Sequence, residues 1–159
     1  MNPTKNDLNL ELREQLCELM NARLADLIDL QTHSKHAHWN VKGPAFIALH
    51  KLFDALSAVV LDHIDELAER IVMLGGFADG TVQLVASKTT LPVYPARITS
   101  GQDHVDALSN SLAAFAKLVR AAADQSAEMG DADTADLFTG ISRDIDKYLW
   151  FVESHLQTT

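Results

Sequence analysis

The chain has 159 residues, a single cysteine and a formal net charge of -9 at neutral pH, and 47% of its residues are hydrophobic. A chain of this length buries a substantial core as one domain, and strong negative charge disfavours binding to nucleic acid or anionic membranes. One cysteine excludes an intrachain disulfide, which suits a reducing cytoplasm.

Membrane insertion and export are not predicted. No stretch approaches about 18 consecutive apolar residues. The first residues, MNPTKNDLNLEL, show neither the basic nor the apolar region of a secretion signal. We therefore expect one cytoplasmic domain over residues 1–159, not associated with a membrane, with residues 1–7 as a short tail.

Apolar residues recur every three or four positions, which predicts an all-α protein. The first helix should begin near Asn6 or Asp7, either of which can cap it, and continue to about His38. The second helix should occupy residues 44–74, because the chain carries helix-breaking or helix-initiating pairs on both sides. These pairs are Gly43-Pro44 and Gly75-Gly76.

Residues 77–99 lose the helical period and contain Pro92 and Pro95, although Val82 to Ser87 can form a short helix. A connection this long is uncommon inside a compact domain unless it crosses the length of a helical bundle. We therefore interpret this segment as a crossover.

Two further helices follow the crossover. Ser100 with Asp103 three residues later predicts a capped start for the third long helix, which should stop at Gly130. The last helix should begin at Asp131 or Asp133. Four long helices with one long crossover after the second predict a ferritin-like four-helix bundle.

Potential metal ligands are concentrated between residues 36 and 70. They are two imidazoles and three carboxylates, with no thiolate, a set that suits iron(II) or manganese, can accept zinc and argues against a structural zinc-thiolate site. A carboxylate four residues from a histidine or aspartate is common on solvated helix faces, so each pair alone says little. The five residues are His38, His50, Asp54, Asp65 and Glu69.

The spacing of the last four ligands is more informative than their identity. On one helix they fall inside one arc of about 100°, yet the first pair lies about 22 Å from the second, so one helix cannot bring both pairs to one metal. The residue numbers of His50 and Glu69 add up to the same total as those of Asp54 and Asp65. The four ligands are therefore placed symmetrically about the middle of the helix. Two copies packed antiparallel about a two-fold axis would therefore place His50 opposite the partner's Glu69. Such a dimer would make two identical sites shared between subunits.

The same residues carry a resemblance to a known family. The segments HWN, HKLFD and DHIDELAER, together with TADLFT-x-SRD-x-DK-x-LWF near the C-terminus, resemble the Dps family, the DNA-binding proteins from starved cells. The resemblance covers Leu8 to Leu156. Trp39, beside His38, is expected either to pack near the site or to lie in the core.

The resemblance implies a ferroxidase site at a dimer interface. The matching ligands are His38, His50 and Asp54 of one subunit with the partner's Asp65 and the partner's Glu69. It further implies a dimer-based dodecameric cage that oxidises iron(II), preferably with hydrogen peroxide and otherwise with oxygen, and stores ferric mineral. Zinc and manganese are expected competitors for iron.

The acidic run at the start of the last helix has two interpretations. Carboxylates there can cap the helix and interact with its dipole. The resemblance also implies a cation pore lined by acidic residues from this region, for which we favour Asp136 and then Asp131. Both interpretations can hold together.

Binding to DNA is the alternative function. Many members of the resembling family hold DNA through a lysine-rich tail, but the segment before the first helix offers only Lys5 and the terminal amine. The C-terminal HLQTT contains no lysine or arginine. We therefore expect weak or absent DNA binding, with association with the nucleoid as the open alternative to a free cytoplasmic cage.

Overall fold

The computed structural model describes residues 1–157, and the predicted all-α architecture is confirmed there. The part of the chain that it describes contains five helices. Their bounds are α1 Leu10–Asn40, α2 Phe46–Met73, α3 Val82–Lys88, α4 Gly101–Glu128 and α5 Ala132–Glu153.

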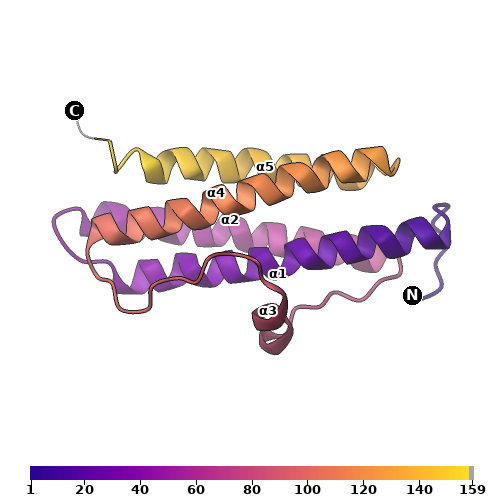
Figure 1. The fold of residues 1–159 in the computed structure, drawn as a ribbon, viewed down its shortest axis with the longest axis horizontal. Coiled ribbons are helices and arrows are strands. Elements are labelled where there is room, and N and C mark those ends of the chain that lie inside the picture. The colour runs from indigo at the N-terminus through magenta and orange to yellow at the C-terminus, as the bar shows by residue number, and fades with distance from the viewer. Residues whose placement is uncertain (158–159) are drawn as a thin grey trace.

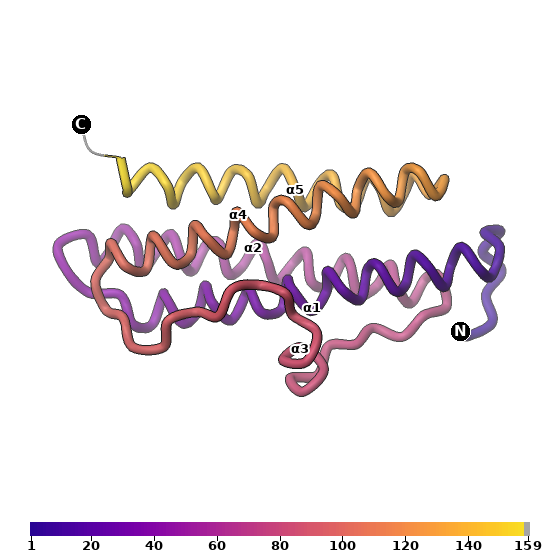
Figure 2. Tube along the Cα trace, in the orientation of Figure 1, coloured from indigo at the N-terminus to yellow at the C-terminus, as the bar shows by residue number. Residues whose placement is uncertain are grey.

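The four long helices form a bundle of two antiparallel pairs, α1 with α2 and α4 with α5 (Figure 1). The chain leaves α2 at one end of the bundle and returns along α1 to the other end, where α4 begins (Figure 2). Helices α2 and α4 therefore run in the same direction. The short α3 interrupts the crossover and packs on α1, close to the predicted position.

Helix α1 begins later than predicted. Asn9 caps it, because the Asn9 side chain accepts a hydrogen bond of 2.9 Å from the Leu12 amide. Asn6 does not cap the helix, since its side chain instead accepts a bond of 3.0 Å from the Leu8 amide in a local turn. The other predicted cap, at Asp7, is likewise wrong. Before the helix, the amide of Asn2 donates to the carbonyl of Gly75, just beyond α2.

The later helix starts agree with the prediction. Ser100 caps α4 and accepts a hydrogen bond of 3.1 Å from the Asp103 amide. Asp131 is the cap residue of α5. Gly130, which separates the two helices, has a φ of 89°, a left-handed conformation that glycine adopts at little cost.

The core lies between the two helix pairs. Its largest side chains include Phe53 of α2, Phe115 of α4 and Phe138 of α5, all fully buried. Burial stabilises each by about 1.5–3 kcal/mol relative to an exposed side chain. The apolar faces predicted from the helical period therefore meet inside the bundle and fix how α1 and α2 lie beside one another.

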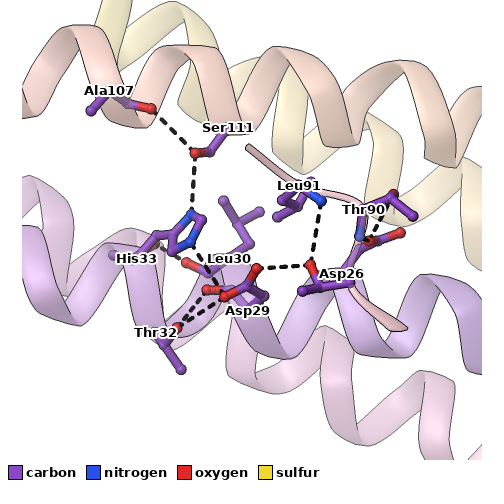
Figure 3. Close-up of polar contacts among 11 residues, drawn as sticks. Asp26, Asp29, Leu30, Thr32, His33, Thr90, Leu91, Ala107 and Ser111 are labelled. Atoms are coloured by element: carbon purple, nitrogen blue, oxygen red, sulfur yellow. Dashed lines mark hydrogen bonds and ion pairs between the residues drawn. The ribbon is translucent and has the colours of Figure 1, made fainter. Parts of the chain in front are cut away.

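Polar contacts hold the crossover against α1 (Figure 3). Asp26 is fully buried and accepts hydrogen bonds from the amide and hydroxyl of Thr90, at 2.7 and 3.0 Å. Asp29 accepts one of 2.7 Å from the Thr89 hydroxyl and lies 3.3 Å from His33 Nε2. The other nitrogen of His33, Nδ1, is 3.1 Å from the Ser111 hydroxyl of α4. This network fixes the segment after α3 between α1 and α4.

None of the helices within residues 1–157 has the length and apolar character needed to cross a membrane.

Candidate metal centre

A tight loop brings the first two predicted ligands together. His38 lies in the last turn of α1 and His50 in the second turn of α2, and residues 41–45 join the helices. Gly43 allows the reversal because its φ is 110°, where other residues are strained. The two imidazole rings stack with centroids 3.8 Å apart and an interplanar angle of 22°.

The backbone fixes the orientation of both rings. His38 Nδ1 lies 2.8 Å from the carbonyl oxygen of His50, and His50 Nδ1 lies 2.8 Å from the carbonyl oxygen of His38. A carbonyl oxygen only accepts, so each Nδ1 carries the donated proton. In the neutral form of either ring this leaves a lone pair on Nε2, and neither Nε2 has a hydrogen-bond partner within the described residues. Such Nδ1 bonds to carbonyl groups are typical of metal-binding histidines.

Asp54 lies one turn beyond His50 and completes one half of the predicted set. Its Oδ1 is 4.0 Å from His38 Nδ1 and 2.7 Å from the ammonium group of Lys35. The hydrogen bond from Lys35 lowers the pKa of Asp54, and the charge of Lys35 acts in the same direction. The carboxylate is therefore ionised and more than half exposed, since 56% of the side chain contacts solvent.

The other two predicted ligands do not reach this group. Asp65 and Glu69 are exposed on α2, and the helical rise places their midpoint about 22 Å from that of His50 and Asp54. Within residues 1–157 no group of three or more potential ligands is arranged to hold a metal ion. One copy of the chain thus stacks His38 on His50 with Asp54 Oδ1 4.0 Å from His38 Nδ1, and it carries Asp65 and Glu69 elsewhere.

The two predicted pore residues differ in environment. Asp131 is 5% exposed, and its carboxylate accepts two hydrogen bonds from one Arg70 nitrogen, at 2.9 and 2.8 Å. Burial alone would raise the pKa of Asp131, but hydrogen bonds from Thr134 and Arg70 outweigh burial and lower it. Asp136 is exposed beside a shallow hollow of α2 and α5 that includes Asp144.

The chain is similar to known proteins over most of its length. The family of ferritin-like domains matches residues 17–159. The DNA protection during starvation protein of Agrobacterium fabrum is 47% identical over 154 residues, which make up 97% of this chain and 95% of that protein. The chain belongs to the Dps family of ferritin-like proteins.

Solved Dps structures have the same fold. A Dps of Mycobacterium smegmatis is 28% identical and superposes with a TM-score of 0.94 over 100% of this chain and 90% of that one. The Dps of Microbacterium arborescens in its high-iron form is 34% identical, with a TM-score of 0.87 over 93% and 96% of the two chains. The Dps fold thus accounts for the whole bundle, including the crossover.

Sequence reasoning missed Lys35, the cation that holds Asp54. Its position three residues before His38 puts both on one face of α1, which is the signal that could have found it. The expectation that Trp39 could lie in the core is wrong, because its side chain is 69% exposed. His63 was also not singled out, yet its two nitrogens lie 2.9 Å from Glu66 and 3.0 Å from Asp144.

Proposed function

We propose that this protein is a ferroxidase whose site is shared between two copies of the chain. His38, His50 and Asp54 of one copy would bind iron together with the partner's Asp65 and the partner's Glu69. The observation that carries the proposal is the pair of histidines held by each other's carbonyl groups, with neither Nε2 hydrogen-bonded within residues 1–157 and the ionised Asp54 carboxylate 4.0 Å from His38 Nδ1. Nitrogen and oxygen donors of this kind suit iron(II), with zinc and manganese as competitors.

The surface of α2 supports the antiparallel dimer independently of the ligands. Large apolar side chains with exposed fractions of 43% to 58% lie along this helix. They are Phe46, Ile47, Leu61, Val72 and Met73. Three of them, Ile47, Leu61 and Val72, fall within an arc of about 40° around the helix. Exposed apolar side chains that share a face in this way are typical of an interaction surface.

These apolar residues obey the pairing that the ligands predict. The register that sets His50 opposite the partner's Glu69 also sets Phe46 opposite the partner's Met73, and Ile47 opposite the partner's Val72. Leu61 falls opposite the partner's Ala58, near the two-fold axis. The two-fold axis of the proposed dimer would therefore bury the exposed apolar residues and also bring the ligands of the two copies together, as an isologous interface requires.

A hollow beside Glu69 fits the same arrangement. It measures about 460 Å³ and is lined by Ala68, Glu69, Val72, Met73 and Ala78. In the proposed register the partner's Phe46 and the partner's Ile47 lie over this hollow. Apolar side chains would then exclude water from the carboxylate end of each site, where low dielectric strengthens the interaction between carboxylate and cation.

The chemistry is oxidation of iron as substrate. Two iron(II) ions give one electron each to hydrogen peroxide, the O–O bond breaks and two hydroxide ions form, so no hydroxyl radical is released. Oxygen is the other candidate oxidant. The carboxylates favour the more highly charged ferric product, and the histidines fix its position.

Storage follows from assembly of such dimers into a hollow dodecamer in the cytoplasm, with ferric mineral inside. Of the two acidic residues proposed for the cation pore, Asp136 is exposed and makes no ion pair within residues 1–157. Asp131 is the weaker candidate, because Arg70 already neutralises it. Removal of iron(II) and peroxide would protect DNA chemically.

Physical protection by DNA binding is the alternative, and the names of several relatives refer to DNA protection. The charge of -9 per chain and a tail with one lysine disfavour it. The amide of Asn2 also donates to Gly75, which holds the start of the tail against the end of α2. Iron oxidation therefore agrees better with the residues present.

Anaerobic addition of iron(II), followed by peroxide, tests the proposal. We expect rapid growth of ferric absorbance in the parent and its loss in the double variant H50A/D54A. The matched control is H155A/D124A, which removes one exposed histidine after α5 and one exposed aspartate of α4, neither of them a proposed ligand. If H50A/D54A oxidises iron as fast as the parent, the proposal is wrong.

A further inference from the structure

Two imidazoles under the crossover have buried nitrogen atoms without a hydrogen-bond partner. They are Nε2 of His36 on α1 and Nε2 of His104 in the first turn of α4, and neither is bonded within residues 1–157. His104 is fully buried. A polar atom that is buried without a partner costs free energy, and nearly all such atoms in folded proteins are satisfied. The two nitrogens therefore indicate a ligand that both can bind.

The two rings lie at a separation that suits one small ion between them. Their centroids are 6.4 Å apart, and their planes make an angle of 55°. A bond from an imidazole nitrogen to a metal is about 2 Å long and the nitrogen lies about 1 Å from the ring centre, so two imidazoles on opposite sides of one ion have centroids about 6 Å apart. The angle between the planes is no obstacle, because each ring can turn about its bond to the metal.

His104 can offer a lone pair to a metal ion. Burial lowers the pKa of His104 and outweighs the opposite effects of the Ile98 backbone and of Asp103, so the imidazole is neutral. Its Nδ1 lies 2.9 Å from the hydroxyl oxygen of Tyr94, which can accept as well as donate. When Nδ1 donates to this oxygen, the lone pair stays on Nε2, as in other metal-binding histidines.

The surroundings supply no third ligand. The ring of His33 also contacts Tyr94, with centroids 4.9 Å apart, but its two nitrogens are already held by Asp29 and Ser111 (Figure 3). Burial raises the pKa of Tyr94, so the phenol keeps its proton and is a poor ligand. Within residues 1–157 no group of three or more potential ligands is arranged to hold a metal. The site therefore consists of two neutral nitrogens.

We propose that His36 and His104 bind one copper(I) ion between their Nε2 atoms. Copper(I) forms linear complexes with two donors, and imidazole suits copper. Divalent ions such as zinc take about four ligands, and charged ligands often offset their two positive charges. One positive charge also costs less to bury than two. Neither histidine is a proposed iron ligand, so the copper site does not depend on the ferroxidase function.

The site would keep copper out of peroxide chemistry. Free copper(I) gives one electron to hydrogen peroxide, the O–O bond breaks, and copper(II), hydroxide and a hydroxyl radical form. Copper(II) prefers a square-planar set of ligands, which two buried imidazoles cannot supply. We therefore expect copper(I) bound by His36 and His104 to react more slowly than free copper(I).

Anaerobic competition with bicinchoninic acid, a coloured copper(I) chelator, tests the proposal. The background is H50A/D54A, which removes two of the proposed iron ligands. This protein should retain one copper(I) per chain, and adding either H36N or H104N should release it to the chelator. Asparagine has no atom at the position of Nε2, and H104N keeps a polar atom beside Tyr94. H155N changes an exposed histidine after α5 and should retain the ion. Retention by both H36N and H104N would overturn the proposal, and so would a background protein that retains no copper.

X-ray absorption at the copper edge identifies the ligands without a substitution at the site, so the proposal stays testable even if both variants unfold. In the same H50A/D54A background we expect two nitrogen neighbours at about 2 Å and no sulfur neighbour. A sulfur neighbour would show that Cys17 or a methionine holds the copper and would overturn the proposal.

Peroxide with a spin trap tests the protective role. The background protein loaded with one copper(I) per chain should release less hydroxyl radical than the same protein carrying H36N and H104N with equal copper. Equal release would overturn the protective role.

Discussion

The imidazoles of His38 and His50 hold one another in place, since each donates its Nδ1 proton to the other residue's backbone carbonyl oxygen at 2.8 Å. The contact joins the end of α1 to the start of α2 and fixes the tautomer of both rings before any metal binds. A metal ion therefore meets two oriented lone pairs. The entropy of ordering these side chains is a cost of folding and not of metal binding.

Lys35 should weaken metal binding at the site. Its ammonium lies 2.7 Å from Asp54 Oδ1, so a metal ion must displace it. In K35M we expect cobalt(II), a spectroscopic substitute for iron(II), to bind more tightly by at most about fivefold, because an exposed ion pair is weak. Titration of the assembled protein, with K117M as an exposed lysine control on α4, measures the change. Weaker binding by K35M would show that Lys35 helps to form the site.

The same variant should change the response to acid. The hydrogen bond from Lys35 lowers the pKa of Asp54, so the carboxylate stays ionised to lower pH than an ordinary aspartate. Without Lys35 the pKa rises towards its usual range, and protons compete with the metal at higher pH. Cobalt(II) titrations from pH 7 downwards should show binding falling away earlier in K35M than in the parent.

Leu61 should be essential for the dimer and not for the fold. It is 55% exposed, and the proposed register sets it opposite the partner's Ala58 near the two-fold axis. L61E would bring two like charges together in a buried interface, which costs several kcal/mol. We expect parental helix content by circular dichroism, smaller particles by sedimentation and loss of iron oxidation. V93E introduces the same charge at a position that is 95% exposed and should leave assembly unchanged.

The ion pair between Arg70 and Asp131 should stabilise the bundle in a pH-dependent way. D131N leaves Arg70 without its buried partner, and we expect a loss of about 3 kcal/mol in the free energy of unfolding at pH 7. The folded-state pKa of Asp131 is lowered, so its stabilisation is complete above about pH 4 and is lost as pH falls through the lowered value. Urea denaturation of the parent and of D131N should therefore show a difference in the free energy of unfolding that becomes smaller as the pH falls. D146N removes an exposed partner of Arg120 and should cost less than about 1 kcal/mol.

Binding to DNA should be weak. At physiological ionic strength and neutral pH we expect no retention of plasmid in a gel, because each chain carries a charge of -9 and its tail offers one lysine. The double variant T4K/D7K adds basic charge to the tail and should retain DNA at low salt. Tight retention by the parent at physiological salt would contradict this expectation.

The bundle could be predicted because its signals are local. Apolar residues at helical spacing and the breaks at Gly43, Gly75 and Gly130 set the four long helices, and the length of the connection indicated a crossover. The start of α1 could not be predicted, since Asn6, Asp7 and Asn9 are all suitable caps. A local turn at Asn6 decided among them.

The candidate site could be predicted in part. Spacing on one helix pointed to the ligands of α2, but the stacking of His38 on His50 depends on the path of a five-residue loop. Lys35 carries no metal-ligand signal in a sequence, because an ammonium repels a cation. The contact between Asp26 and Thr90 depends on how a long irregular segment docks on α1, and no periodic pattern encodes that docking.

Complementation between two inactive variants tests the shared site most directly. H50A/D54A and D65A/E69A should each be inactive alone. In a mixed dimer, one of the two sites combines the intact histidines and Asp54 of one chain with the intact Asp65 and Glu69 of the other. Co-expression at equal levels should therefore restore about one quarter of the parental rate of iron oxidation, because half of the dimers are mixed and each has one intact site. No recovery in mixed assemblies of parental size would contradict the shared site.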